Sequence, residues 1–252
     1  MKDTLLILQA RTGSTRLPSK MVKDFYQGQT IVDIILEKLL VTFKPEQIVV
    51  ATTIHQNDDK LVETAIRNGV NIFRGDEQNV LDRFISCANK FNTKKIVRIC
   101  ADNPFLLPEY IPALIDCLIS DNLEYCSYHW PDGTPIMQSH IGVFAEAMTL
   151  GFLEKIKNFT QEAFYHEHVT NYLYTNKDKF NHKFLPIPSC LHEKKYIRLT
   201  VDSLEDFLLM QVLYAEVNSN DRNYNLEDLI QHIEENSLLL EKMRIEVEKN
   251  AK

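Results

Sequence analysis

The chain has 252 residues, of which 44% are hydrophobic and 25% are charged. This composition is ordinary for a globular protein, and the length suits a single domain over 1–252 with at most a small insertion. The formal net charge of −7 disfavours a general nucleic-acid binder, which normally presents a basic surface, but it leaves room for a local basic loop that binds phosphate.

The five cysteines show neither the spacing of zinc ligands nor a disulfide framework, and their number is odd. This pattern is typical of a reducing compartment. No apolar run approaches the roughly 20 residues that a transmembrane helix needs. We therefore expect a cytoplasmic protein that binds neither membrane nor nucleic acid.

Short apolar runs alternate with helical periodicity over the first 120 residues. Such alternation is typical of an α/β fold in which helices flank a mostly parallel sheet. Strands are predicted at Leu5–Gln9, Gln47–Ala51, Val70–Phe73 and Lys95–Ile99, and helices at Ile31–Phe43, Asp58–Asn68, Asn79–Phe91 and Glu109–Ser120.

The rhythm changes after about residue 122. Tyr125–His129, a Pro-Asp-Gly turn and Met137–Phe144 predict a hairpin, so that a β-rich insertion projects from the domain at about 123–145. A helical tail is predicted at about 203–250. The other elements predicted here are helices at Ala145–Ile156, Thr160–Tyr174, Leu204–Val217, Leu226–Asn236 and Leu238–Lys249, and strands at His182–Ile187 and Tyr196–Thr200.

The loop directly after the first strand carries the strongest chemical signal, with the sequence QARTGSTRLPSK at 9–20. In an open parallel sheet, ligands bind beyond the carboxyl ends of the strands, where this loop lies. Arg11, Arg16 and Lys20 supply three cations, and Ser14 adds a hydroxyl group. Arginine forks onto phosphate oxygens and lysine acts as a point charge, so the loop suits a triphosphate.

Two nucleotide-binding motifs are missing from the sequence. It has no G-x-x-x-x-G-K-[ST], and no G-x-G-x-x-G follows a predicted strand. These absences disfavour a P-loop ATPase and a dinucleotide-dependent oxidoreductase.

Two aspartates follow predicted strands and should meet the basic loop at the same edge of the sheet. Asp102 follows Lys95–Ile99, and Asp202 follows Tyr196–Thr200. Together they suit Mg²⁺, which usually takes one or two carboxylates plus phosphate oxygens and water. The alternative for Asp202 is the N-cap of the next helix, a role that Ser203 fits equally well.

Two further strand ends are candidates for the nucleotide pocket. Arg74 and Gly75 follow a short strand, and glycine there would let the backbone approach a base. Thr52 ends another strand. The alternative for these residues is an ordinary turn between strand and helix.

The sequence resembles the cytidylyltransferases that make CMP-activated KDO and sialic-type acids. The opening motif Ala10-Arg11-x-x-Ser14-Thr15-Arg16-Leu17-Pro18-x-Lys20, with a glutamine before it, is most similar to the SpsF-type proteins of surface-polysaccharide biosynthesis. The resemblance continues in family order and spans about residues 4 to 210. Its other blocks are FRGD at 73–76, VLDR at 80–83, RICADNP at 98–104, HIGVF at 140–144, EHVT at 167–170 and RLTVDSLEDF at 198–207.

The resemblance implies a nucleotide-diphospho-sugar transferase fold, CTP as the nucleotide, and Mg²⁺ bound by Asp102 and Asp202. It places His140 near the acceptor site, where Gln138 and Glu167 are further candidates for substrate contacts, and a structural role for His140 remains the alternative. His166 stands where the SpsF-type pattern usually has arginine, which leaves an acceptor contact there open. The spacing of the histidines 140, 166 and 168 fits no common zinc motif.

We therefore predict a Mg²⁺-dependent enzyme that moves CMP from CTP to an acidic sugar or related acceptor and releases pyrophosphate. Arg11, Lys20 and Asp102 are the predicted catalytic residues. The resemblance also implies a homodimer, for which a projecting hairpin with Tyr128, Trp130 and Ile136 would supply contact area. The alternatives are a nucleotide-sugar-dependent glycosyltransferase, disfavoured because Asn103-Pro104 replaces a D-x-D pair, and a catalytically silent nucleotide-binding protein.

Overall fold

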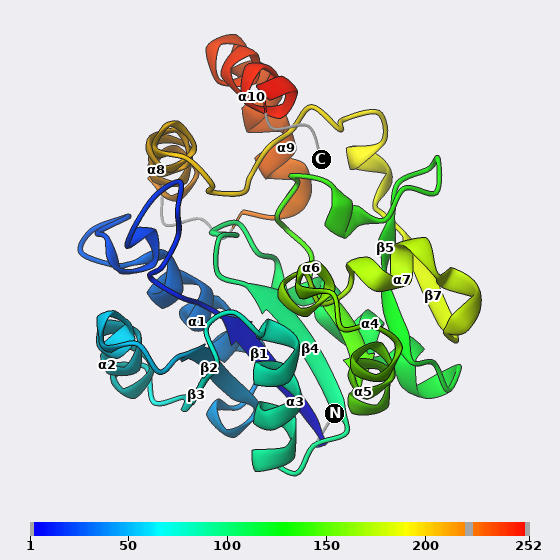
Figure 1. The fold of residues 1–252 in the computed structure, drawn as a ribbon. Helices are drawn as coiled ribbons and strands as arrows, with labels where there is room; N and C mark the ends of the chain where they lie inside the picture. Colours follow the sequence, from blue (N-terminus) through cyan, green and yellow to red (C-terminus); the bar gives the residue numbers. More distant parts are fainter. Residues whose placement is uncertain (1–2, 220–223, 250–252) are drawn as a thin grey trace.

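A computed structural model describes residues 3–219 and 224–249 of the chain. Its centre is a seven-stranded sheet with the strand order β3-β2-β1-β4-β6-β5-β7 (Figure 1). Only β6 runs antiparallel to its neighbours among these strands. The strands are β1 (Thr4–Gln9), β2 (Ile48–Thr53), β3 (Asn71–Gly75), β4 (Lys95–Cys100), β5 (Tyr125–His129), β6 (Glu146–Thr149) and β7 (His182–Pro186).

Helices cover both faces of the sheet (Figure 1). Successive strand residues point to opposite faces, so Leu6 and Leu8 of β1 join the apolar core on the side of α1, whereas Leu5 and Ile7 join the core on the side of α3. The helices are α1 (Ile31–Thr42), α2 (Asp59–Arg67), α3 (Val80–Lys90), α4 (Ile111–Ser120), α5 (Leu150–Phe159), α6 (Ala163–Glu167), α7 (Asn171–Thr175), α8 (Leu204–Asn218), α9 (Leu226–Glu235) and α10 (Ser237–Lys249).

The predicted fold class is confirmed, and the elements of the first 120 residues lie close to their predicted bounds. The apolar pattern succeeds best for β1 and β2, which are buried on both faces, whereas the edge strand β3 is only half-buried. A short 3₁₀ turn at Pro108–Tyr110 precedes α4, so the α-helix itself starts later than predicted. No helix within the described residues is long and apolar enough to cross a membrane.

The expected projecting insertion at 123–145 is wrong, because its first strand belongs to the main sheet. β5 lies between β6 and β7, and Tyr125 is fully buried. The predicted hairpin partner Met137–Phe144 is not a strand and instead begins with a 3₁₀ turn at Ile136–Gln138. The strand that pairs with β5 in antiparallel orientation is β6, in a segment that the apolar spacing had suggested was helical.

Two later predictions also need correction. Thr160–Tyr174 does not form one helix, since α6 and α7 are separate short helices. Tyr196–Thr200 runs outside the sheet, although its backbone is anchored by a hydrogen bond of 2.8 Å from Leu199 N to the carbonyl oxygen of His140. The predicted tail is present as α8, α9 and α10, while residues 220–223 and 250 lie outside the described part of the chain.

Candidate active site

A cleft of about 830 Å³ opens at the carboxyl ends of β1 and β4. Gln9 and Cys100, the last residues of these strands, lie at its floor, and the loop that follows β1 forms one wall. This is where a ligand binds in an open, mostly parallel sheet. Eight of the residues predicted from the sequence line the cleft, namely Arg11, Ser14, Arg16, Lys20, Asp102, Gln138, Glu167 and Asp202.

The three predicted cations of the basic loop come together in this cleft, each bonded to an oxygen of the protein. Arg11 donates from Nη1 to the carbonyl oxygen of Glu77 (3.1 Å) and from Nη2 to Glu167 (3.0 Å). Arg16, whose side chain is 58% exposed, pairs with Asp202 at 2.7 Å. Lys20 is buried and donates to the carbonyl oxygen of Val201 at 2.5 Å.

Asp58 anchors this loop to the end of β2. Its Oδ1 accepts hydrogen bonds from the backbone and hydroxyl of Thr12, and its Oδ2 accepts from Thr52 and from both groups of Thr53. Burial alone would raise the pKa of Asp58, but these hydrogen bonds outweigh it and hold the pKa below its usual value. The loop therefore starts from a fixed point beside the sheet.

Asp102 and Asp202 line the same cleft although they are 100 positions apart. Their segments are bridged by a hydrogen bond of 2.8 Å from Val201 N to the carbonyl oxygen of Asp102. Asp202 is buried, and Ser203, not Asp202, caps α8 by accepting from the backbone of Asp206. The N-cap alternative for Asp202 therefore does not explain its position.

The buried side chain of Arg198 holds the carboxylate of Asp202 in position. Arg198 donates from Nη2 to Oδ2 of Asp202 at 2.9 Å and grips both oxygens of Asp206 at 2.6 and 2.7 Å. Its Nη1 lies 2.5 Å from Nδ1 of His140. His140 is buried in this network and does not line the cleft, so the structure favours the structural alternative for this histidine.

A further part of the cleft lining carries the other predicted acceptor contacts. Gln138 and Glu167 are exposed side chains that line it, together with Phe164 and His168 from the segment of α6. His166 turns its Nε2 to the carbonyl oxygen of Thr160 at 3.0 Å and does not line the cleft. This wall mixes an apolar ring with polar groups, as small-molecule sites commonly do.

Three residues predicted for the nucleotide pocket lie outside the cleft. Thr52 is fully buried and bonded to Asp58. Arg74 uses its guanidinium on the carbonyl oxygens of Thr53 and His55 and on Asp59. Gly75 leaves no room for a side chain, since a Cβ there would lie only 2.9 Å from Cγ of Arg83. This geometry supports the alternative of an ordinary strand-to-helix turn.

Sequence reasoning missed Asp58, Arg198 and Arg98, which position or line the site. Arg98 lies at the floor of the cleft on β4. A signal for it was present, because Arg98 is a charge in the middle of an apolar strand, where an unpaired charge would be costly. Asp58 and Arg198 carried no comparable signal, because the contacts that tie them to other parts of the site, with Thr12 and His140, span 46 and 58 residues.

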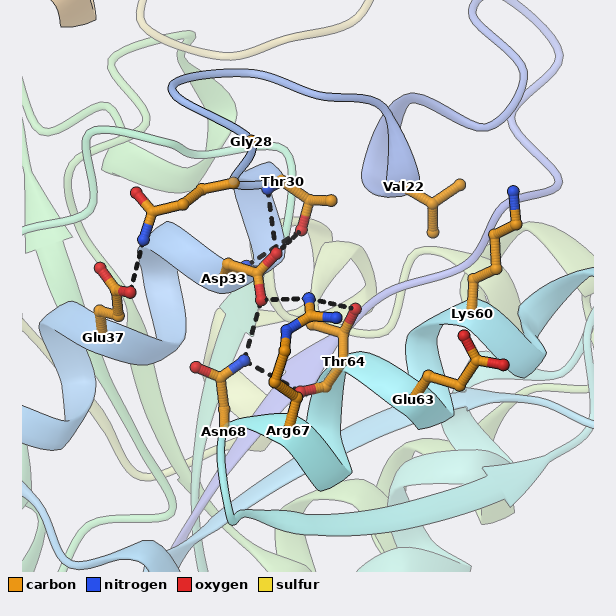
Figure 2. A pocket seen from close by; sticks show the side chains of 11 residues that line it. Val22, Gly28, Thr30, Asp33, Glu37, Lys60, Glu63, Thr64, Arg67 and Asn68 are labelled. Carbon is orange, nitrogen blue, oxygen red and sulfur yellow. Dashed lines mark hydrogen bonds and ion pairs between the residues drawn. The ribbon is translucent and has the colours of Figure 1, made fainter.

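A second cavity of about 490 Å³ lies between α1 and α2 (Figure 2). The two carboxylates that α1 contributes, Asp33 and Glu37, are already paired. Asp33 forms a capping box with Thr30 at the start of α1 and accepts hydrogen bonds from Arg67 (2.7 Å) and Asn68 (2.9 Å) of the second helix and its C-cap (Figure 2). These contacts explain the cavity as helix packing.

A basic loop facing two carboxylates at the carboxyl edge of a mostly parallel sheet is an arrangement suited to a nucleotidyltransferase. The family model described as "Cytidylyltransferase" matches residues 5–245, and the chain belongs to this family.

Similar proteins agree with this assignment. An uncharacterized protein of Methanocaldococcus jannaschii is 35% identical over 91% of this chain and 90% of its own length. The spore coat polysaccharide biosynthesis protein SpsF of Bacillus subtilis is 31% identical over 86% of this chain and 88% of its own length. A solved cytidylyltransferase structure from Leptospira borgpetersenii is 28% identical, covers 94% of this chain and 96% of its own, and has a TM-score of 0.81. The predicted family and enzyme class are thus confirmed.

Proposed function

We propose that this enzyme transfers CMP from CTP to an acidic sugar of the KDO or nonulosonic type, or to a related acid, and releases pyrophosphate. Mg²⁺ is the proposed cofactor, and surface polysaccharide or glycan biosynthesis is the proposed setting. The observation that carries the proposal is that one cleft contains all three loop cations and both aspartates. The family's description and the SpsF relative support the nucleotide and the setting, respectively.

The loop cations are the proposed phosphate ligands. Arg16 is exposed and now pairs with Asp202, and Lys20 points to the backbone beside that aspartate. Phosphate oxygens would replace these protein oxygens as acceptors, so the cations are already aimed near the triphosphate site. Preorganised charges of this kind stabilise the developing negative charge without having to reorient during the reaction.

Asp102 and Asp202 would hold the Mg²⁺. Both are hard oxygen ligands, and within the described residues no group of three or more His, Cys, Asp or Glu side chains could hold a metal. Two carboxylates fit Mg²⁺, which completes its shell with phosphate oxygens and water. When bound, the ion supplies charge neutralisation at the phosphates.

The proposed reaction is a single displacement at phosphorus. The acceptor hydroxyl oxygen bonds to the α-phosphorus, the bond to the β-phosphate bridging oxygen breaks, pyrophosphate leaves, and the hydroxyl proton passes to solvent. Such chemistry depends mainly on positioning and charge. Gln138 and Glu167 line the cleft and are the proposed acceptor contacts, and Glu167 accepts a hydrogen bond from Arg11 of the loop.

Pyrophosphate release tests this proposal. The purified enzyme is mixed with Mg²⁺, one of CTP, UTP, ATP or GTP, and a panel of hydroxy acids that includes KDO and N-acetylneuraminate. We expect release only with CTP and an acid. Lys20→Ala should lower the rate about 10²- to 10³-fold, while Lys60→Ala, on the outer helix α2, should not. A preference for UTP or ATP would overturn the nucleotide assignment.

We also propose a homodimer that acts in the cytoplasm, as the family resemblance and the absence of a disulfide among the described residues suggest. Tyr128, Trp130 and Ile136 are buried, so they do not provide the exposed hairpin surface that the sequence had suggested. Light scattering during turnover tests the dimer, and a fully active monomer at micromolar concentration would contradict it.

A further inference from the structure

Arg98 lies at the floor of the cleft, and the proposed mechanism gives it no role. It lies on β4 four residues before Asp102, and its side chain is only 13% exposed. Gln9 and Cys100 line the floor beside it, while Glu167 and His168 line the wall next to α6. Its contact with Thr170, between α6 and α7, puts Arg98 beside the segment that brings Glu167 and His168 to the cleft, whereas Asp202 is bonded by Arg16.

The guanidinium of Arg98 is held rigidly by the protein. Its Nε donates to Oε1 of Gln9 at 3.2 Å, and its Nη1 donates to Glu146 and to the hydroxyl of Thr170 at 3.3 Å. Glu146 is fully buried, and its other oxygen accepts from the hydroxyl of Tyr125. Arg98 is thus held by residues of three separate segments, and the carboxylate of Glu146 balances its charge.

The remaining nitrogen of Arg98 has a different environment. No described residue accepts a hydrogen bond from Nη2, and Arg98 contributes to the lining of the cleft. A fixed guanidinium with one free edge toward a ligand cleft suits an oxyanion, because arginine forms directional hydrogen bonds to carboxylate and phosphate oxygens with little loss of entropy.

The position in the sheet separates this donor from the triphosphate loop. The loop begins at the end of β1 and reaches Asp202 through Arg16. Arg98 instead contacts Thr170, in the segment that also brings Phe164, His168 and Asn171 to the cleft. An anion bound there would lie on the acceptor side of the α-phosphate.

We propose that Nη2 of Arg98 binds the anionic group of the acceptor, a carboxylate or a phosphonate. This inference rests on the proposed function, because it assigns part of the cleft to the acceptor. It makes Arg98 a specificity residue, since a neutral sugar would leave a buried charged donor without a partner.

Calorimetry with defined probes tests this assignment. The enzyme is saturated with Mg²⁺ and α,β-methylene-CTP, which does not react, and is titrated with KDO, N-acetylneuraminate and 2-hydroxyethylphosphonate. Each acid is compared with its neutral ester. We expect at least one acid to bind and its ester to bind at least 10-fold more weakly. The carboxylate and phosphonate arms show which anion the lobe accepts.

The variant is chosen so that folding is preserved. Arg98→Gln alone would leave Glu146 buried without its partner, so it is combined with Glu146→Gln, which keeps hydrogen-bonding groups and removes both charges. The double variant should bind the CTP analogue normally and lose about 10- to 100-fold in acid affinity. Glu146→Gln alone keeps the Arg98 guanidinium with its contacts to Gln9 and Thr170, so it should weaken acid binding less than the double variant does.

Three outcomes would overturn the proposal. Unchanged acid affinity in the double variant would reject Arg98 while leaving the proposed function intact. Equal loss of acid and CTP-analogue binding, also seen with Glu146→Gln alone, would show that the pair is only structural. Failure of every acid to bind the wild-type enzyme would reject both Arg98 and the acidic class of acceptor.

Discussion

Arg198 holds Asp202 in position: its Nη2 lies 2.9 Å from Oδ2 of that carboxylate. Arg198 is itself clamped by Asp206 in the first turn of α8, so the orientation of Asp202 depends on the start of a helix. Burial alone would lower the pKa of Arg198, but the two aspartates outweigh it and raise that pKa, which keeps the guanidinium charged. One oxygen of Asp202 is thus committed to Arg198, and the other faces Arg16.

Arg198→Lys should therefore weaken the metal site without removing a metal ligand. Lysine has no planar fork and cannot contact both aspartates in the same way. We expect about 10- to 100-fold lower activity, together with a higher Mg²⁺ concentration for half-maximal rate. Steady-state kinetics over a Mg²⁺ series measures both. Arg67→Lys, at an exposed arginine outside the cleft, is the matched control. An unchanged Mg²⁺ requirement would show that Arg198 does not position a metal ligand.

Asp102→Asn and Asp202→Asn should each reduce turnover at least about 10²-fold, because each removes a proposed charge contact to the metal. Their effects on folding should differ. Asp102 is half-buried, whereas Asp202 is paired with a fully buried arginine. The free energy of unfolding should therefore stay near wild type for Asp102→Asn and fall by about 1–3 kcal/mol for Asp202→Asn.

Urea unfolding without metal and CTP turnover with Mg²⁺ are measured on the same preparations. Asp116→Asn, an exposed acid on α4, serves as the control for loss of one negative charge. Stabilisation by CTP plus Mg²⁺ should shrink in both cleft variants. Normal turnover in either variant would remove that aspartate from the proposed metal site.

The sequence predicted the site best where the candidate residues directly follow a recognisable strand. The basic loop follows β1 directly, so a single strand prediction was enough to place Arg11, Arg16 and Lys20 at the carboxyl edge. The sequence also placed Asp202 at the cleft, but it did so by predicting a sheet strand just before this residue. The segment before Asp202 pairs with no strand of the sheet.

The errors arose where tertiary contacts determined the structure. β6 is a strand because it pairs with β4 and β5, although its apolar residues also fit the start of a helix. Trp130 was expected in an exposed hairpin and is 1% exposed, because it belongs to the apolar core on the side of α1. Thr52 stood at the end of a strand, as a ligand contact would, but its hydroxyl is used by Asp58. Such pairings depend on residues that meet only in three dimensions.

Asp58→Asn should lower the free energy of unfolding by about 1–3 kcal/mol near pH 7, since several buried donors would lose a charged acceptor. The pKa of Asp58 is lower in the folded chain than its ordinary value of 3.8. The unfolded chain therefore binds more protons in the interval below 3.8, and the stabilisation by Asp58 is lost as the pH falls through that interval.

The measurement is urea unfolding of wild type and variant between pH 3 and pH 7. The difference between them should be constant above about pH 5 and shrink toward acid. Asp59→Asn provides a neighbouring control, because Asp59 is 59% exposed and pairs only at the surface with Arg74. A difference that does not change with pH would contradict the role of the ionised Asp58 carboxylate.

Lys38→Met should change how stability depends on pH at the alkaline end. Lys38, on α1, donates from Nζ to the carbonyl oxygen of Pro104 at 2.9 Å and to the hydroxyl of Tyr224 at 2.5 Å, and burial lowers its pKa to about 7 from an ordinary 10.5. Between these two values the unfolded chain binds more protons at this site than the folded chain. The contribution of Lys38 to stability should therefore rise with pH, with a slope that does not exceed about 1.4 kcal/mol per pH unit.

Urea unfolding from pH 6.5 to 9.5 should show wild type gaining stability relative to Lys38→Met, whereas Lys60→Met, at an exposed lysine of α2, should run parallel to wild type. Parallel curves for wild type and Lys38→Met would mean that the amino group keeps an ordinary pKa in the folded chain.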